Sequence, residues 1–148
     1  MDLQDVADKI EIHELLARYA RGVDTRDWEL WKSVFTEDAV VDYSRSGIPS
    51  GTRDEVAEVL RLAFEGIPWA THYITNIEVD LDGDRAKVRA MFYNPLQLAG
   101  MEKESATGGC YLHDLVRTPG GWKSRHLVEE PTWSVNLPGV GADAGGPA

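Results

Sequence analysis

Apolar side chains recur at helical spacing near the start of the chain. From Leu3 to Val23 they return every three or four positions, with one slip in phase. This period predicts a long amphipathic helix that ends near Gly22. A second helical piece is predicted over residues 27–35, where Trp28 is the first of several apolar residues that share a face.

A third helix is predicted from its start and stop signals. Thr52 and Glu55 match a T-x-x-E capping box, in which each side chain bonds to the backbone N–H of the other residue. Gly66, shortly before Pro68, ends the helix. The predicted buried face consists of Val56, Val59, Leu60, Ala63 and Phe64.

Later in the chain, apolar residues occur at every second position instead of at helical spacing. A β-prone stretch, Ala39–Tyr43, already predicts one strand between the helices. From Trp69 onward, residues 77–92 predict a hairpin that turns at "DGD". Residues 108–130 predict a second hairpin that turns at "PGG".

This order of elements predicts the α+β class, with helices first and a run of antiparallel strands after them. A strongly curved mixed or antiparallel sheet, with the N-terminal helices packed on its concave side, would form a cone-shaped barrel with a pocket. A single domain is expected over residues 1–135, because no repeat or linker divides them. Residues 136–148 are rich in glycine and proline, which is typical of a flexible tail.

Composition narrows the possible partners and compartments. The chain has 148 residues, of which 43% are hydrophobic and 27% charged, as in ordinary globular proteins. Its net charge of −10, without a basic run, argues against nucleic-acid and membrane partners. A single cysteine, Cys110, excludes an internal disulfide, and the acidic N-terminus is unlike a signal peptide. We therefore expect a cytoplasmic protein.

Three polar side chains are candidates for chemistry. On spacing alone, Asp24 suits a helix cap or a turn, and Tyr19 suits a core position with its hydroxyl at the rim. His72 begins a predicted strand in "ATHYITN" and shares its parity with Asn76. A buried imidazole needs a partner, and a carboxylate on one ring nitrogen would leave the other free as a general base. A structural histidine is the alternative that the spacing leaves open.

No motif indicates a metal ion or a nucleotide cofactor. His113 and His126 lie on the two strands of the last hairpin near several carboxylates, but no H-x-x-x-H or C-x-x-C spacing accompanies them. The chain contains neither a P-loop nor a G-x-G-x-x-G motif, and it lacks the G-x-S-x-G motif of many hydrolases. The expected site therefore holds no metal and uses no cofactor.

Taken together, these stretches resemble the SnoaL-like family of the nuclear-transport-factor-2-like superfamily. The resemblance spans roughly residues 5–130 and includes "ELLARYARGVDTRDWELWKSVFTEDAVVDY", "THYITNIEVDLDGDRAKV" and "GGCYLHDLVRTPGGWK". The more specific signal is Asp24 followed by His72 in "THYITN". It looks like the Asp–His pair of the family's lyases, namely scytalone dehydratase, bile acid 7α-dehydratase and hexachlorocyclohexane dehydrochlorinase.

The resemblance implies roles for four residues. The histidine of those lyases acts as the base and the aspartate orients it, so His72 and Asp24 would be the catalytic pair. Tyr19 matches a tyrosine on the first helix of the bile-acid enzyme, and Tyr43 matches a pocket tyrosine of scytalone dehydratase. A second pocket histidine has no clear counterpart here. Arg125 lies near the strand on which some relatives carry an arginine.

These features predict a cofactor-independent lyase that acts on a hydrophobic cyclic molecule by dehydration or a related β-elimination. An isomerase or a polyketide-type cyclase would begin with the same proton abstraction, and a non-catalytic small-molecule-binding domain is a third possibility. The outer face of a curved sheet needs covering, so a homo-oligomer, a trimer or a dimer, is expected. The predicted substrate-binding residues are Trp28, Phe35, Trp69, Asn76, Met91 and Arg125.

Overall fold

The computed structural model describes residues 1–138, in which helices come first and long strands follow. The helices are α1 Leu3–Asp24, α2 Trp28–Ser33 and α3 Arg53–Phe64, with a short 3-10 turn η1 at Ser44–Ser46. The strands are β1 Phe35–Asp42, β2 Gly51–Thr52, β3 Trp69–Ala70, β4 Tyr73–Asp82, β5 Arg85–Gln97, β6 Ser105–Thr118 and β7 Gly121–Val135. Both predicted hairpins are confirmed, as β4–β5 and β6–β7.

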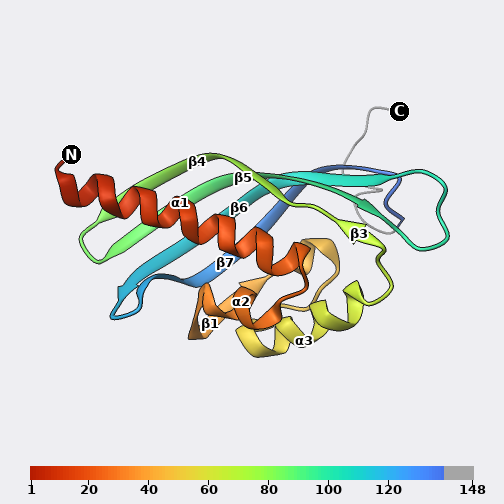
Figure 1. Cartoon of the computed structure of the whole chain (residues 1–148), viewed down its shortest axis with the longest axis horizontal. Coiled ribbons are helices and arrows are strands. Elements are labelled where there is room, and N and C mark those ends of the chain that lie inside the picture. The colour runs from red at the N-terminus through yellow and green to blue at the C-terminus, as the bar shows by residue number, and fades with distance from the viewer. Residues whose placement is uncertain (139–148) are drawn as a thin grey trace.

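The strands form one mixed sheet. Its order is β2-β1-β7-β6-β5-β3, and β4 also pairs with β5. The pairing of β1 with β7 is parallel and the other pairs are antiparallel. Figure 1 shows α1 lying along this curled sheet, and α2 and α3 lie near the C-terminal end of α1. The predicted α+β cone is confirmed: three helices pack on a strongly curled sheet that forms a half-barrel.

Local signals determine where the helices begin. Asp2 and Asp5 form a capping box at the start of α1, and the predicted capping box of Thr52 and Glu55 opens α3. The buried face of α3 is narrower than predicted, because Val59 and Ala63 are exposed while Ala57 is buried in the core. Val56 and Leu60 are buried as predicted.

The segment after α2 differs from the prediction. Helix α2 ends at Ser33, and Phe35 begins strand β1 instead of continuing the helical face. The strand therefore starts four residues before Ala39. Its parallel pairing with β7 explains the difference, because the register includes Phe35 opposite Ser124 before an irregularity interrupts the pairing. Such a long-range pairing overrides local helical periodicity.

The core lies between α1 and the sheet. Its largest fully buried side chains include Trp31 of α2, Tyr19 of α1 and Trp122 of β7. Gly22 lets α2 pack tightly against the end of α1, since a Cβ there would lie 2.8 Å from the backbone nitrogen of Trp31. This packing holds the C-terminal end of α1, which carries Asp24, against α2.

A row of aromatic side chains lies on the outer face of the sheet. Tyr73 stacks on Tyr93, and Tyr93 stacks on Trp133, with ring centroids 6.0 and 5.9 Å apart. All three side chains are exposed. The predicted homo-oligomer remains a prediction, for which this row is a natural contact surface.

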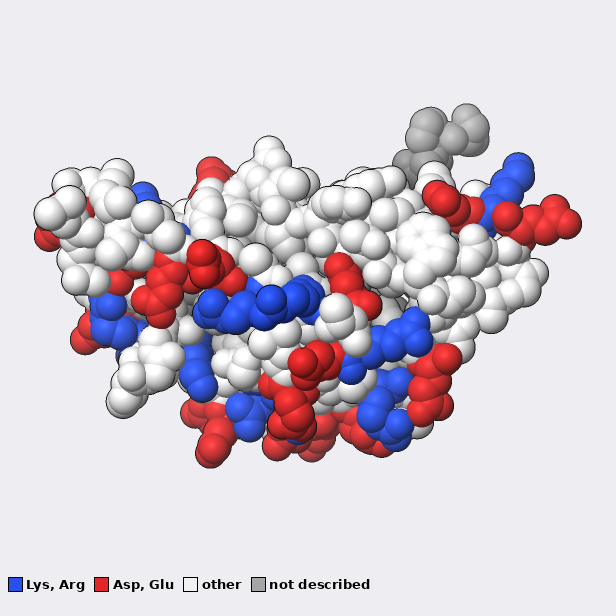
Figure 2. Space-filling model, in the orientation of Figure 1, with Lys and Arg blue, Asp and Glu red and all other residues white. Residues whose placement is uncertain are grey.

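Charges of both signs lie on the face of the helices. Figure 2 shows acidic and basic side chains interspersed over the helices. Within residues 1–138, no helix combines the length and the apolar character that crossing a membrane requires. The predicted tail, 136–148, lies outside the described residues from residue 139 onward. Asn136 is fixed, because its carbonyl accepts a hydrogen bond from Ser105 at 2.5 Å.

A buried ion pair ties α1 to the β6–β7 hairpin. The carboxylate of Asp8 accepts two hydrogen bonds from Arg117, both at 2.8 Å, and one from Trp122 Nε1 at 3.1 Å. Asp8 is almost fully buried, whereas Arg117 keeps partial access to solvent. Hydrogen bonding to Arg117, opposed by burial, holds the pKa of Asp8 well below its usual range.

We expect Asp8→Asn to lower the free energy of unfolding by roughly 2–4 kcal/mol at neutral pH, because it leaves the guanidinium of Arg117 without its buried partner. Because the pKa is lowered in the folded state, this stabilisation is present above the unfolded pKa of about 3.9 and is lost as pH falls below it. Urea unfolding at neutral and acidic pH measures both effects. Asp84→Asn, which removes the exposed partner of Arg117, is the control, with an expected loss of about 1 kcal/mol or less. Equal losses in the two variants would contradict this explanation.

Candidate active site

Asp24 and His72, 48 residues apart in sequence, are in direct contact. Asp24 Oδ1 lies 2.6 Å from His72 Nδ1. The backbone N–H of His72 also donates to both carboxylate oxygens, at 2.9 and 3.1 Å. The predicted contact is therefore confirmed. Since a carboxylate oxygen accepts the hydrogen bond, Nδ1 carries the proton and Nε2 is the basic nitrogen of the ring.

Both members of the pair are held by ordered backbone. Asp24 is the last residue of α1, and Thr25 closes the helix, since its N–H and its hydroxyl both donate to a carbonyl one turn earlier. His72 lies in the two-residue segment between β3 and β4. The preceding residue, Thr71, donates its N–H to a carbonyl of β5 and accepts at 3.0 Å from the side chain of Asn94. The carboxylate and the imidazole are therefore in place before any ligand arrives.

His72 lines a cavity of about 280 Å³ inside the half-barrel, and Asp24 lies behind it, outside the cavity lining. His72 Nε2 has no hydrogen-bond partner among residues 1–138. Apolar lining comes from Val23, Ile48, Leu60, Ala63, Phe64, Ile67, Leu96, Leu98 and Leu137. Polar lining comes from Tyr19, Tyr43, Ser46, Asn94, Thr107, Tyr111 and Glu129. An apolar enclosure with a few convergent polar groups is typical of a small-molecule site.

Two predicted tyrosines meet in this cavity. The hydroxyls of Tyr19 and Tyr43 lie 2.5 Å apart, so one donates to the other. The hydroxyl of Tyr19 is also hydrogen-bonded to that of Tyr111. The ring of Tyr111 packs edge-on against Tyr19, with centroids 5.3 Å apart. Burial raises the pKa of all three hydroxyls well above the ordinary tyrosine value. These groups are neutral hydrogen-bond donors at physiological pH.

Glu129 lines the cavity and is not among the predicted site residues. It lies on β7, where its side chain is 9% exposed, and it accepts a hydrogen bond from Ser46. A signal was present in the sequence, because Glu129 shares strand parity with the apolar Leu127. A carboxyl group on the apolar face of a strand is unusual, and it therefore marks a candidate functional residue.

Four of the predicted lining residues lie elsewhere. Phe35 is fully buried in the core, and Trp28 packs edge-on against Phe64, with ring centroids 5.8 Å apart, but does not line the cavity. Trp69 is partly exposed on β3. Met91 alternates with buried neighbours on β5 and therefore faces away from the cavity. The aromatic character of a residue alone did not show whether its side chain lies in the core, on the surface or in the cavity lining.

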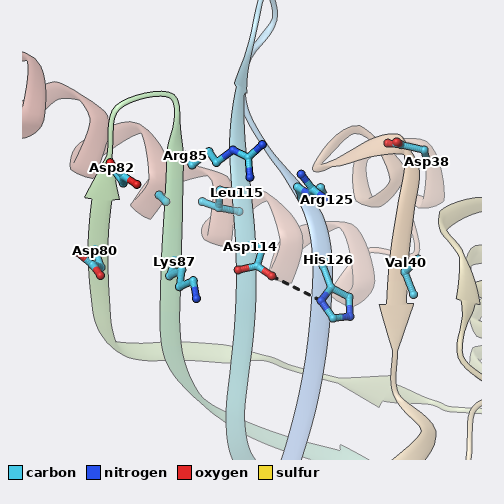
Figure 3. Close-up of a pocket in the computed structure, with 11 residues that line it drawn as sticks. Asp38, Val40, Asp80, Asp82, Arg85, Lys87, Asp114, Leu115, Arg125 and His126 are labelled. Carbon is cyan, nitrogen blue, oxygen red and sulfur yellow. Dashed lines mark ion pairs between the residues drawn. The ribbon is translucent and has the colours of Figure 1, made fainter.

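The other two predicted lining residues, Asn76 and Arg125, are displaced by irregularities in their strands. Asn76 has a positive φ of 49° at a register shift in β4, so it is exposed and does not share the inward direction of His72. Arg125 lies at a register shift in β7, between the residues that pair with Asp114 and Leu115. Figure 3 shows Arg125 beside His126. Both residues line a separate cleft, which has a volume of about 710 Å³. That cleft is larger, but its polar groups are mostly surface charges, and His72 is not among its lining residues.

The other histidines have separate surroundings. His113 is buried and lies 2.9 Å from Ser124 Oγ, and burial lowers its pKa to about 3, so its ring stays neutral. His126 Nδ1 lies 3.6 Å from Asp114 on the outer cleft. Among residues 1–138, no three His, Cys, Asp or Glu side chains are grouped so that they could hold a metal ion.

Comparison with known proteins identifies the family. The family model described as "SnoaL-like domain" matches residues 4–128. The chain belongs to the SnoaL-like family. An uncharacterised protein of Mycobacterium tuberculosis is 32% identical over 130 residues, which cover 87% of this SnoaL-like chain and 88% of the relative.

Solved structures show the same fold. A scytalone dehydratase-like protein of Novosphingobium aromaticivorans has a TM-score of 0.82 at 20% identity, covering 90% of this chain and 89% of that one. The hexachlorocyclohexane dehydrochlorinase LinA-type3 of Novosphingobium barchaimii has a TM-score of 0.82 at 20% identity, covering 95% and 97%. At this identity, the comparison establishes a common fold for the SnoaL-like chain and these proteins.

Proposed function

We propose that this SnoaL-like protein is a cofactor-independent lyase that eliminates a small leaving group from a hydrophobic cyclic molecule. The observation that carries the proposal is the hydrogen bond from His72 Nδ1 to Asp24, with His72 lining an apolar cavity. Nε2 is then the nitrogen available as a base. The dehydratase-like and dehydrochlorinase proteins with the same fold support elimination as the reaction class.

In the proposed reaction, His72 removes a proton from a carbon of the substrate. Asp24 fixes the ring and its tautomer, and it balances the positive charge that the imidazole gains. The two hydrogen bonds from the backbone N–H of His72 hold the carboxylate in that position. Asp24 is therefore a positioning residue, and His72 is the group that contacts the substrate.

The tyrosine pair suits the negative charge that develops when the proton leaves. If that carbon is next to a carbonyl, electrons move onto the carbonyl oxygen. The paired hydroxyls of Tyr19 and Tyr43 could donate one hydrogen bond to this oxygen from a buried position. A preorganised donor in a site with little water stabilises such an oxyanion strongly.

Incubation with hydrophobic cyclic ketones that carry a β-hydroxyl or β-chloro group tests the proposal. Mass spectrometry should detect loss of water or hydrogen chloride with the wild-type protein and not with His72→Ala. Isomerisation or cyclisation would leave the substrate mass unchanged, so the same assay separates these reactions. Binding of the ketones without any His72-dependent product would favour a non-catalytic binding domain.

A further inference from the structure

Glu129 is a carboxyl group in the cavity that the His72–Asp24 pair does not use. It lies directly across from Tyr111 in the pairing of β7 with β6. Ser46 of η1 donates a hydrogen bond to its Oε1. Strands β5 and β6 lie between Glu129 and the segment of His72 in the sheet, and the curl of the sheet brings both side chains to one cavity.

Glu129 forms no ion pair with a lysine or an arginine of residues 1–138. The residues that follow them contain no Lys, Arg or His. Burial favours the neutral form of an unpaired carboxyl group. Burial accordingly raises the pKa of Glu129, and this effect exceeds the opposite effects of Ser46, His72 and Tyr111.

We propose that Glu129 is a second catalytic residue, a neutral carboxylic acid that donates its proton to a leaving hydroxyl group. The substrate class is then a cyclic compound with a hydroxyl group β to a carbonyl. This inference rests on the proposed function, in which His72 is the base. It makes the reaction a dehydration, because hydroxide leaves poorly without a proton whereas chloride leaves as a stable anion.

The proposed step is balanced. His72 takes a proton from the carbon between the carbonyl carbon and the carbon that bears the hydroxyl. The C–H electron pair becomes the new C=C bond, and the C–O bond breaks with its electrons on oxygen. The proton of Glu129 completes a water molecule. The imidazolium of His72 then returns one proton through water to the carboxylate of Glu129, which restores both residues.

A pair of matched probes tests the acid role. β-Hydroxycyclohexanone and β-chlorocyclohexanone give the same cyclohexenone, whose absorbance reports both rates. Glu129→Gln should lower kcat/KM for the hydroxyl probe by about 10²-fold and leave the chloro probe little changed. Glu130→Gln is the control, because Glu130 pairs with Arg45 outside the cavity lining, and neither rate should change. Equal losses on both probes would overturn the acid role.

The protonation state of Glu129 gives an independent readout that needs no turnover. At neutral pH, the infrared spectrum of the wild type should contain the carbonyl band of a protonated carboxylic acid. This band should be absent from the spectrum of Glu129→Gln and present in that of Glu130→Gln. A Glu129 that is ionised at neutral pH would overturn the proposal. If Glu129→Gln does not fold, Glu129→Asp replaces it, with an expected shift of that band and a selective loss on the hydroxyl probe.

Failure of the two proposals can be told apart. If His72→Ala retains wild-type rates on both probes, the proposed function fails and the acid role fails with it. If His72→Ala loses activity on both probes while Glu129→Gln loses none on the hydroxyl probe, the lyase remains and only the role of Glu129 is overturned.

Discussion

His72→Ala is expected to lower kcat/KM for elimination by about 10⁴-fold, the upper end of what a positioned base contributes. Nε2 is the only ring nitrogen free to accept the proton, because Nδ1 is bonded to Asp24. Alanine removes the base and leaves the rest of the lining in place. Steady-state kinetics on a substrate found by the mass-spectrometric assay measures the loss.

His126→Ala is the matched control for this loss. His126 is 44% exposed on the outer cleft and does not line the cavity of His72. The variant should keep the wild-type rate. A loss of less than tenfold in His72→Ala, or similar losses in the two variants, would show that His72 is not the base.

Asp24→Asn is expected to lower kcat by about 10³-fold with little change in KM. A carboxylate accepts hydrogen bonds on both oxygens, here from the ring and from the backbone N–H of His72. Asparagine offers one oxygen and one NH₂ group. If the NH₂ group faces the backbone N–H, the 2.9 Å hydrogen bond is lost, and if it faces the ring, the ring takes the other tautomer and Nε2 is no longer basic. Loss of the orienting aspartate in a Ser-His-Asp triad costs about 10⁴-fold for the same reason.

NMR of the ring nitrogens separates this positioning role from a structural one. In the wild type the proton should reside on Nδ1 of His72, and in Asp24→Asn its position should change. The thermal unfolding midpoint controls for stability. A variant that loses activity only in proportion to its unfolded fraction, with the His72 tautomer unchanged, would contradict the positioning role.

Features that depend on neighbouring residues were predictable from the sequence. The capping box of Thr52 and Glu55 and the turns of both hairpins involve residues a few positions apart, so their signals are local. The contact between Asp24 and His72 is different. Spacing alone left it open, and only the resemblance to a family implied it before the structure confirmed it.

The cavity lining was less predictable, because it depends on strand irregularities and on the curl of the sheet. Parity rules assume an unbroken strand, and the register shifts in β4 and β7 displace Asn76 and Arg125 from the directions that parity implies. Glu129 and Tyr111 come together across β6 and β7. Whether that pair faces the core or the solvent depends on the packing of the helices.

Exchange of a carbon-bound proton for deuterium tests the central role of His72 most directly. A cyclic ketone without a leaving group, chosen because it binds the wild-type protein, is incubated in heavy water and examined by NMR. The wild type should place deuterium at the carbon next to the carbonyl, and His72→Ala, which should still bind the ketone, should not exceed the rate in buffer. Exchange at the same rate in both proteins, or in neither, would contradict proton abstraction by His72.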